Sequence, residues 1–205
     1  MTTARAAGSI DDDVPPPAAG AEPNREGPLV LYLPGRSLLL VAGLPGAGKS
    51  TLLAGLAGIE GVRVLDSGSA RSALAGRLPA GTPYPVYRWL THLVHRASVA
   101  GVCAGPVPTV VVHLPATAPR VRAVVRGLAR LTRRDPHLLW LDVPADEALD
   151  GQRARGRVVR PRPFAAHARR AERTAVRLRT GLEPGWTSIR STDRSGARRG
   201  LALAQ

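Results

Sequence analysis

The stretch Gly43-Leu44-Pro45-Gly46-Ala47-Gly48-Lys49-Ser50 (GLPGAGKS) decides the fold of this chain. It matches the pattern G-x-x-x-x-G-K-[ST] at every position. The apolar run at 37–42 (SLLLVA) precedes it and predicts a buried strand, and residues 49–57 predict a helix that ends near Gly58. A glycine-rich turn between such a strand and a helix is the context in which this pattern binds phosphate.

The chemistry of the loop follows from its residue types. Glycines let the backbone turn so that consecutive N–H groups point inward, and the helix N-terminus adds roughly half a positive charge. We expect residues 43–51, which end with Thr51, to bind the phosphates of a nucleoside triphosphate. ATP is the nucleotide that we expect. Lys49 is expected to reach the β- and γ-phosphates, and the Ser50 hydroxyl to hold Mg²⁺. The alternative is a glycine-rich turn that binds nothing.

The single lysine supports the phosphate-binding interpretation. Of the 29 basic residues in the chain, Lys49 is the only lysine and the rest are arginines. A compact ammonium group can enter a phosphate cradle where a planar guanidinium would not fit. The lysine is therefore expected to stand at this position for its chemistry.

The formal net charge of +14 is concentrated in the C-terminal part of the chain. Residues 119–205 carry 20 basic and 8 acidic residues, whereas residues 1–60 carry 4 basic and 6 acidic residues. A positive field of this size is compatible with a nucleic-acid partner. Arginine in the company of abundant Ala, Gly and Pro also indicates a compositional bias, so solvated helix faces are the alternative.

Composition also bears on compartment and domain organisation. The chain has one cysteine, Cys103, so it forms no internal disulfide. Neither a signal sequence nor a membrane-spanning run is visible. We therefore expect a cytoplasmic protein with no membrane partner. Residues 1–28 are acidic and proline-rich and are expected to be a disordered tail. The predicted domain covers 29–195, and 196–205 are expected to be a C-terminal tail.

Buried strands alternate with amphipathic helices along the domain, which predicts an α/β fold with a parallel sheet. Strands are expected at 62–65, 108–114, 137–143 and 186–190, and helices near 85–99, 146–153 and 164–178. A further helix before Pro136 should face the core with its apolar side and solvent with its arginines. The apolar side contains Val121, Val124, Val125, Leu128 and Leu131, and the arginines are Arg122, Arg126, Arg130 and Arg133.

Over residues 36–195 the sequence resembles the small P-loop kinases, a group with adenylate-kinase-like, zeta-toxin-like and polynucleotide-kinase-like branches. The resemblance rests on 43–51, on the segment 66–71, on Leu141-Asp142-Val143-Pro144, and on 152–157 (QRARGR). It implies a P-loop NTPase three-layer sandwich with a mostly parallel five-stranded sheet. It also implies a mobile Arg-rich lid that closes over the triphosphate.

The implied lid contains five arginines within ten residues: Arg153, Arg155, Arg157, Arg160 and Arg162. Arg153 and Arg157 are four residues apart, so on one helix they would share a face and both aim at phosphates. A guanidinium on the transferring group is worth roughly 10³–10⁵ in rate in related chemistry. The alternative is a solvated basic loop.

The resemblance also implies a carboxylate and an arginine that handle the phosphoryl acceptor. Asp66, at the end of a predicted strand, could activate an acceptor hydroxyl, and Arg71 could pair with an anionic acceptor. Asp66 could instead cap the following turn. Two positions depart from the family pattern: Gly68 stands where the polynucleotide-kinase-like base is expected, and His113 stands where many P-loop proteins have a Mg²⁺-linked aspartate.

Aromatic residues gather before the third strand. Tyr84, Tyr87 and Trp89 lie within six residues in a chain with seven aromatics, and Tyr84 and Tyr87 are candidates for stacking on an acceptor base or sugar. A helix face packed on the core explains them equally well. His92 and His95, at i and i+3, are too few to predict a metal site.

The sequence therefore predicts a phosphotransferase that moves the ATP γ-phosphate to a small molecule or a nucleic-acid end. An acceptor with a hydroxyl group or an anionic group fits the basic composition. A nucleotide-dependent ATPase or switch without an acceptor is the alternative, and Gly68 and His113 favour it. A regulatory protein with vestigial catalysis is a third possibility.

Overall fold

The computed structural model describes residues 27–79, 81–156 and 161–204. Its centre is a five-stranded sheet in the order β3-β4-β2-β5-β6, in which every neighbouring pair is parallel. The strands are β2 (Ser37–Gly43), β3 (Val62–Asp66), β4 (Thr109–His113), β5 (Asp135–Leu141) and β6 (Ser188–Thr192). All seven residues of β2 are buried, as expected for a central parallel strand covered on both faces.

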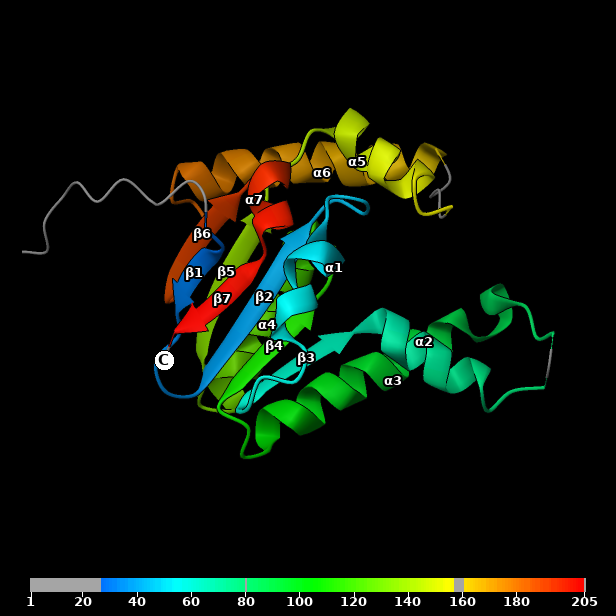
Figure 1. Ribbon diagram of the computed structural model, residues 1–205, viewed down its shortest axis with the longest axis horizontal. Helices are drawn as coiled ribbons and strands as arrows, with labels where there is room; N and C mark the ends of the chain where they lie inside the picture. Colours follow the sequence, from blue (N-terminus) through cyan, green and yellow to red (C-terminus); the bar gives the residue numbers. More distant parts are fainter. Residues whose placement is uncertain (1–26, 80, 157–160, 205) are drawn as a thin grey trace, which may run out of the picture.

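Helices cover both faces of this sheet and give three layers (Figure 1). Helices α3 and α4 pack on one face, and α1 and α7 lie on the other. The helices are α1 (Lys49–Leu52), the 3₁₀ turn η1 (Ala54–Leu56), α2 (Ser67–Ala75), α3 (Tyr84–Ala104), α4 (Pro119–Leu131), α5 (Ala145–Arg153), α6 (Pro161–Arg179) and α7 (Arg194–Arg199). Figure 1 places α5 and α6 on the side toward which β2 and β5 point. The α/β class, the three layers and the five-stranded parallel sheet are confirmed.

The C-terminal residues extend the fold beyond the predicted domain. Strand β7 (Leu201–Ala204) pairs in parallel with β1 (Leu29–Tyr32), and Leu201 and Leu31 are both buried. The boundary predicted at residue 195 falls inside α7. The four residues of β7 are too few to show a pattern that predicts a strand. Their pairing partners in β1 lie 172 positions earlier in the sequence. The predicted tail at 1–28 lies almost wholly outside the described residues.

Helix α4 faces the core with a different side from the one that its pattern predicts. Val124 and Leu131 are 70% and 82% exposed, whereas Arg122, predicted to face solvent, is fully buried at 0%. Val125 and Ala129 complete the buried side. The predicted apolar face is wrong because Arg122 has a buried partner, described below, that turns the helix toward it. In α6, by contrast, the residues that helical spacing places on one apolar face lie on the core side: Phe164, Ala171, Ala175 and Leu178 are buried and Ala168 is half-buried.

Candidate nucleotide-binding site

The glycine-rich loop connects β2 to α1 at the carboxyl edge of the sheet. Gly46 and Gly48 have φ angles of 92° and 103°, in the left-handed region that glycine adopts without strain. Gly48 is the N-cap of α1 and Lys49 is its first residue. The loop thus has the strand–turn–helix context that phosphate binding by backbone N–H groups requires. The predicted helix at 49–57 is shorter than expected, because α1 ends at Leu52 and η1 follows it.

Helix α5 packs directly against this loop. A Cβ added at Gly46 would lie 2.0 Å from the Ala148 carbonyl oxygen and 2.8 Å from Cγ of Gln152. The Gln152 side chain donates a hydrogen bond of 2.8 Å to the Pro45 carbonyl oxygen. Contact at this range leaves no room for a side chain at Gly46 and fixes the path of the loop.

Replacing Gly46 with alanine is therefore expected to lower ATP affinity at least tenfold and to reduce stability by more than the about 1–2 kcal/mol that left-handed backbone alone costs. The added methyl group must displace α5 or the loop. Gly58→Ala is the matched control, because Gly58 has φ 83° and no atom within 4 Å of an added Cβ. ATP titration and thermal unfolding measure both effects. Equal behaviour of the two variants would contradict the packing argument.

Lys49 is the most buried charge of the site. Its side chain is held inside the loop, where Nζ donates hydrogen bonds of 2.9 Å to the Gly43 carbonyl oxygen and 2.6 Å to the Leu44 carbonyl oxygen. The residue is only 4% exposed. Burial, followed by the nearby charge of Arg155, lowers the pKa of Lys49 to about 7. A triphosphate in the loop would supply the negative charge that this ammonium group lacks.

Ser50 and Thr51 are exposed on the first turn of α1, next to the loop. The Arg155 guanidinium donates a hydrogen bond of 3.4 Å to the Thr51 hydroxyl. Among the described residues, no group of three or more His, Cys, Asp or Glu side chains could hold a metal ion. An exposed hydroxyl beside a phosphate loop is a ligand that fits Mg²⁺, which binds mainly through substrate phosphates and water. The exposed Ser50 hydroxyl would be its protein ligand.

Asp66 and His113 lie side by side at the same edge, because β3 and β4 pair them in register. The Asp66 carboxylate accepts a hydrogen bond of 2.5 Å from the Gly68 N–H and caps α2. The pKa of His113 is lowered to about 4, chiefly by burial and next by the charge of Lys49, while the charge of Asp66 opposes both. His113 therefore lies within electrostatic reach of both Lys49 and Asp66, and its ring is neutral at pH 7.

A cavity of about 670 Å³ runs along β3, with η1, α2 and α3 around it and Asp66 among its lining residues. Apolar side chains line most of it, and the polar groups include Asp66, Ser69, Arg77 and His95. His95 is 4% exposed, and its Nε2 atom has no hydrogen-bond partner among the described residues. Burial lowers the pKa of His95, and the charge of Asp66 opposes this effect. A largely apolar cavity with a few converging polar groups is typical of a small-molecule site.

The predicted acceptor residues Arg71, Tyr84 and Tyr87 come together where α2 meets α3. The Arg71 guanidinium lies 4.1 Å from the centroid of the Tyr84 ring, and the Tyr84 and Tyr87 rings meet edge to face at 5.4 Å. Tyr87 is buried, whereas Trp89 is 66% exposed. Arg71 and Tyr84 thus contact one another and do not line the cavity, whereas Asp66 and His95 do.

Helix α5 carries the first of the predicted lid arginines. It ends at Arg153 and a turn follows at 154–156, so the shared helical face of Arg153 and Arg157 stays a prediction. Arg153 is exposed and pairs with Asp150 on its own helix at 3.0 Å. Arg157 lies outside the described residues. Arg155, which spacing alone did not single out, is the arginine beside the loop.

Loop conformation, strand order and the buried lysine together define a P-loop NTPase of the small-kinase type, a class that binds nucleotides. A family model described as an AAA domain matches residues 38–179, so the chain belongs to this family of AAA domains. No curated protein sequence matches the chain.

Solved structures share the fold. A candidate kinase from Chloroflexus aurantiacus aligns with a TM-score of 0.53 and 12% identity, over 78% of this chain and 86% of the other. A chain of the PezAT toxin–antitoxin system of Streptococcus pneumoniae aligns with a TM-score of 0.58 and 14% identity, over 83% and 71%. At such identities the likeness concerns the fold. In the part of the chain that the structure describes, no helix has both the length and the apolar character needed to cross a membrane.

Proposed function

We propose that this protein is an ATP-dependent phosphotransferase that moves the γ-phosphate to an acceptor hydroxyl. The observation that carries the proposal is that Asp66 lines a cavity and lies in register beside His113, which is within electrostatic reach of the buried Lys49 of the phosphate loop. A hydrolase needs space for one water molecule beside the γ-phosphate. A cavity of about 670 Å³ at this position suits an organic acceptor better.

In the proposed reaction the loop N–H groups and Lys49 hold the triphosphate, and Mg²⁺, which the Ser50 hydroxyl would hold, would neutralise negative charge on its phosphates. The acceptor hydroxyl attacks the γ-phosphorus and transfers its proton to the Asp66 carboxylate. The bond between the γ-phosphorus and the β,γ-bridging oxygen breaks, and ADP leaves. Arg155 is the described arginine placed to neutralise charge on the transferring group, and Arg153 could join it only after a change of rotamer.

The ATPase alternative has one observation in its favour. Asp66 already accepts a hydrogen bond from Gly68, which is the position where the related kinases carry an acid. A carboxylate committed to capping α2 is a weaker base, because hydrogen bonds to the charged form stabilise it. The two functions differ in the fate of the γ-phosphate and in their dependence on Asp66.

Asp66→Asn is expected to reduce γ-phosphate transfer by about 10²–10⁴-fold, the usual contribution of a general base, with ATP affinity unchanged. Asparagine caps helices as well as aspartate does, so this variant keeps α2 intact and removes only the basic group. The experiment follows label from γ-labelled ATP into cell-extract acceptors and into inorganic phosphate.

Asp193→Asn is the matched control, because Asp193 caps α7 in the same way, through the Gly196 N–H. Transfer that disappears in Asp66→Asn and in Lys49→Ala but persists in Asp193→Asn supports the kinase. Label found only in inorganic phosphate, at a rate indifferent to Asp66→Asn, supports the ATPase.

A further inference from the structure

Helix α6 carries a stripe of arginines on its solvent side. At about 100° per residue, five of the six arginines of α6 fall within an arc of about 100°. The buried residues Phe164, Ala171, Ala175 and Leu178 lie on the other side of the helix. All five arginines of the stripe are exposed: Arg162, Arg169, Arg170, Arg173 and Arg177. The stripe extends over about 22 Å, at a rise of about 1.5 Å per residue.

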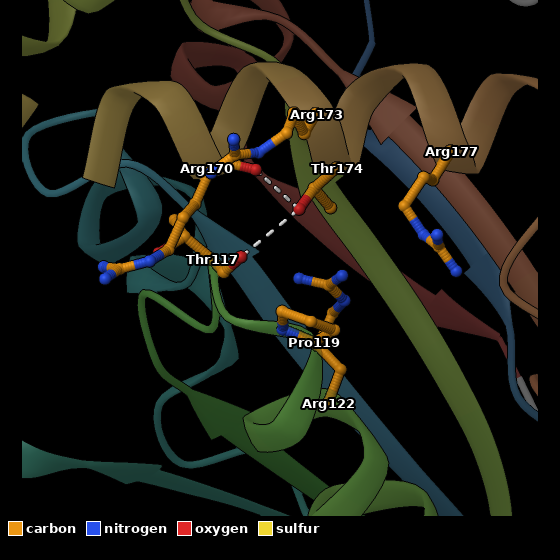
Figure 2. A pocket seen from close by; sticks show the side chains of 7 residues that line it. All are labelled: Thr117, Pro119, Arg122, Arg170, Arg173, Thr174 and Arg177. Atoms are coloured by element: carbon orange, nitrogen blue, oxygen red, sulfur yellow. Dashed lines mark hydrogen bonds between the residues drawn. The ribbon is translucent and has the colours of Figure 1, made fainter. Parts of the chain in front are cut away.

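The charged ends of the stripe belong to the surface of the protein. Figure 2 shows Arg170, Arg173 and Arg177 on α6, beside Thr117 and Pro119. The hollow of about 380 Å³ between them is lined by the aliphatic parts of these arginine side chains. The hollow is therefore apolar, and the guanidinium groups lie outside it, where a large partner can reach them.

The positive charge of the stripe is not neutralised within the described part of the chain. Glu172, the single acidic residue of α6, lies outside the arc. The ion pairs found among the described residues include none of the five arginines. Arg177 donates a hydrogen bond to the Leu182 carbonyl oxygen, which carries no full charge. The stripe is thus a surface of uncompensated positive charge.

A biased composition adds arginines to a chain but does not gather them on one face without acids. On α4, Arg122 and Arg126 share the Glu183 carboxylate, and on α5 Arg153 pairs with Asp150. Like charges three or four residues apart on a helix repel one another and lower its stability. The stripe retains this cost in the protein alone, and a negatively charged partner would remove it.

The residues of the arc favour one class of anionic partner. A membrane surface would need an apolar helix face turned toward lipid, but the apolar face of α6 is buried in the core. Protein partners are usually anchored by aromatic or other large side chains, and besides its arginines the arc contains only Ala166. A single nucleic-acid strand is bound largely by stacking on aromatic rings, which the arc also lacks. A double helix keeps its bases stacked internally and presents phosphates outward.

We propose that the stripe on α6 binds the phosphate backbone of a nucleic-acid double helix, independently of base sequence. A length of about 22 Å spans about six phosphates of one strand, at 3.4 Å per nucleotide. Arginine forms bidentate, charge-assisted hydrogen bonds with phosphate, and such backbone contacts carry no sequence information. The inference goes beyond the proposed function, because the stripe would bind a double helix whether or not that helix is the phosphoryl acceptor.

The test measures binding of a short fluorescent DNA duplex of mixed sequence to the full chain. The chain is saturated with a non-hydrolysable ATP analogue and Mg²⁺, so that the phosphate loop is occupied. In the double variant Arg169→Gln/Arg173→Gln, affinity for the duplex at about 50 mM salt should fall about tenfold. The slope of log K against log salt should become shallower by about 1.8, since each phosphate contact contributes about 0.9.

Arg88→Gln/Arg96→Gln is the matched control, because it removes the same charge from exposed positions of α3. Figure 1 places α3 and α6 on opposite sides of the molecule, so salt should screen most of its effect and the loss should stay below about threefold. Arg169→Lys/Arg173→Lys keeps the charge and should keep the salt slope. The Gln variant of α6 should melt no lower than the wild type, because repulsion between like charges is relieved.

Equal losses in the two Gln variants would overturn the proposal, because net charge and not the stripe would then determine binding. Absence of duplex binding at about 50 mM salt would overturn it as well. Tighter binding of a single strand than of the duplex would assign the stripe to unpaired nucleic acid. Complete displacement of the duplex by polyglutamate at equal charge concentration would assign it to an acidic protein. Either of these assignments would also reject the double helix as the partner.

Discussion

Lys49→Ala is expected to reduce γ-phosphate transfer or hydrolysis by at least about 10²–10³-fold, the usual effect of removing one group that stabilises transition-state charge. The Lys49 ammonium group is already placed inside the loop, 2.9 Å and 2.6 Å from two carbonyl oxygens. No other lysine exists in the chain that could replace it. Measurement of kcat and of ATP affinity separates loss of chemistry from loss of binding.

Lys49→Arg is the sharper test of the same idea. It retains the charge, but a planar guanidinium is larger than the ammonium group and the site is 4% exposed. We therefore expect Lys49→Arg to be almost as inactive as Lys49→Ala. Wild-type turnover in either variant would contradict the role given to this residue.

The burial of Lys49, which activity is expected to require, should lower the stability of the nucleotide-free protein near pH 7. The pKa of Lys49 is about 7 in the folded, nucleotide-free protein and 10.5 in the unfolded chain. The unfolded state therefore binds more protons between these values, and stability should rise as the pH increases from about 7 toward 10.5. Lys49→Met should remove this rise and melt at a higher temperature than the wild type at pH 7. Thermal unfolding without nucleotide, across that pH range, measures the difference.

The phosphate loop and its neighbouring strands could be predicted from the sequence because their signals are local. The apolar run 37–42, the glycines and the lysine all lie within fifteen residues of one another, and the structure has β2, the loop and α1 in that order. The position of Asp66 at a strand end could also be predicted from the nearby sequence. The cavity beside Asp66 could not be predicted in this way, because η1, α2, β3 and α3 together form it.

Errors arose where distant residues decide the outcome. Periodicity favoured a valine-rich buried face on α4, but Glu183 lies 61 residues away and draws Arg122 inward. The pairing of Arg153 with Arg157, which regular spacing favoured, stays a prediction, because α5 ends at Arg153 and Arg157 lies outside the described residues.

The buried ion pair of Arg122 and Glu183 gives the second large prediction. The Arg122 guanidinium donates two hydrogen bonds of 2.6 Å to the Glu183 carboxylate, from Nε and from one terminal nitrogen. Its other terminal nitrogen donates 2.7 Å to the carbonyl oxygen of Ala116, which has a strained φ of 44°. Side-chain exposures are 0% for Arg122 and 4% for Glu183. The pair thus ties α4, the turn after α6 and the segment that follows β4.

Arg122→Leu is expected to lower the free energy of unfolding by about 3–5 kcal/mol, because it leaves the buried Glu183 carboxylate with only Arg126. The double variant Arg122→Leu/Glu183→Leu should recover most of this loss, since the uncompensated charge is gone. Arg179→Leu is the control: its ion pair with Asp142 is exposed and should contribute no more than about 1 kcal/mol. Denaturant unfolding measures all three.

The pH dependence provides an independent check on the pair. Burial alone would raise the pKa of Glu183, but the hydrogen bonds and charges of Arg122 and then Arg126 hold it below the ordinary value of 4.5. The stabilisation should therefore be complete above about pH 4.5 and disappear as the pH falls through the lower folded value. Arg122→Leu should flatten this acid-side decline. A single variant as stable as the double variant, with the decline unchanged, would show that the pair contributes no stability and that another interaction holds α4 in its observed orientation.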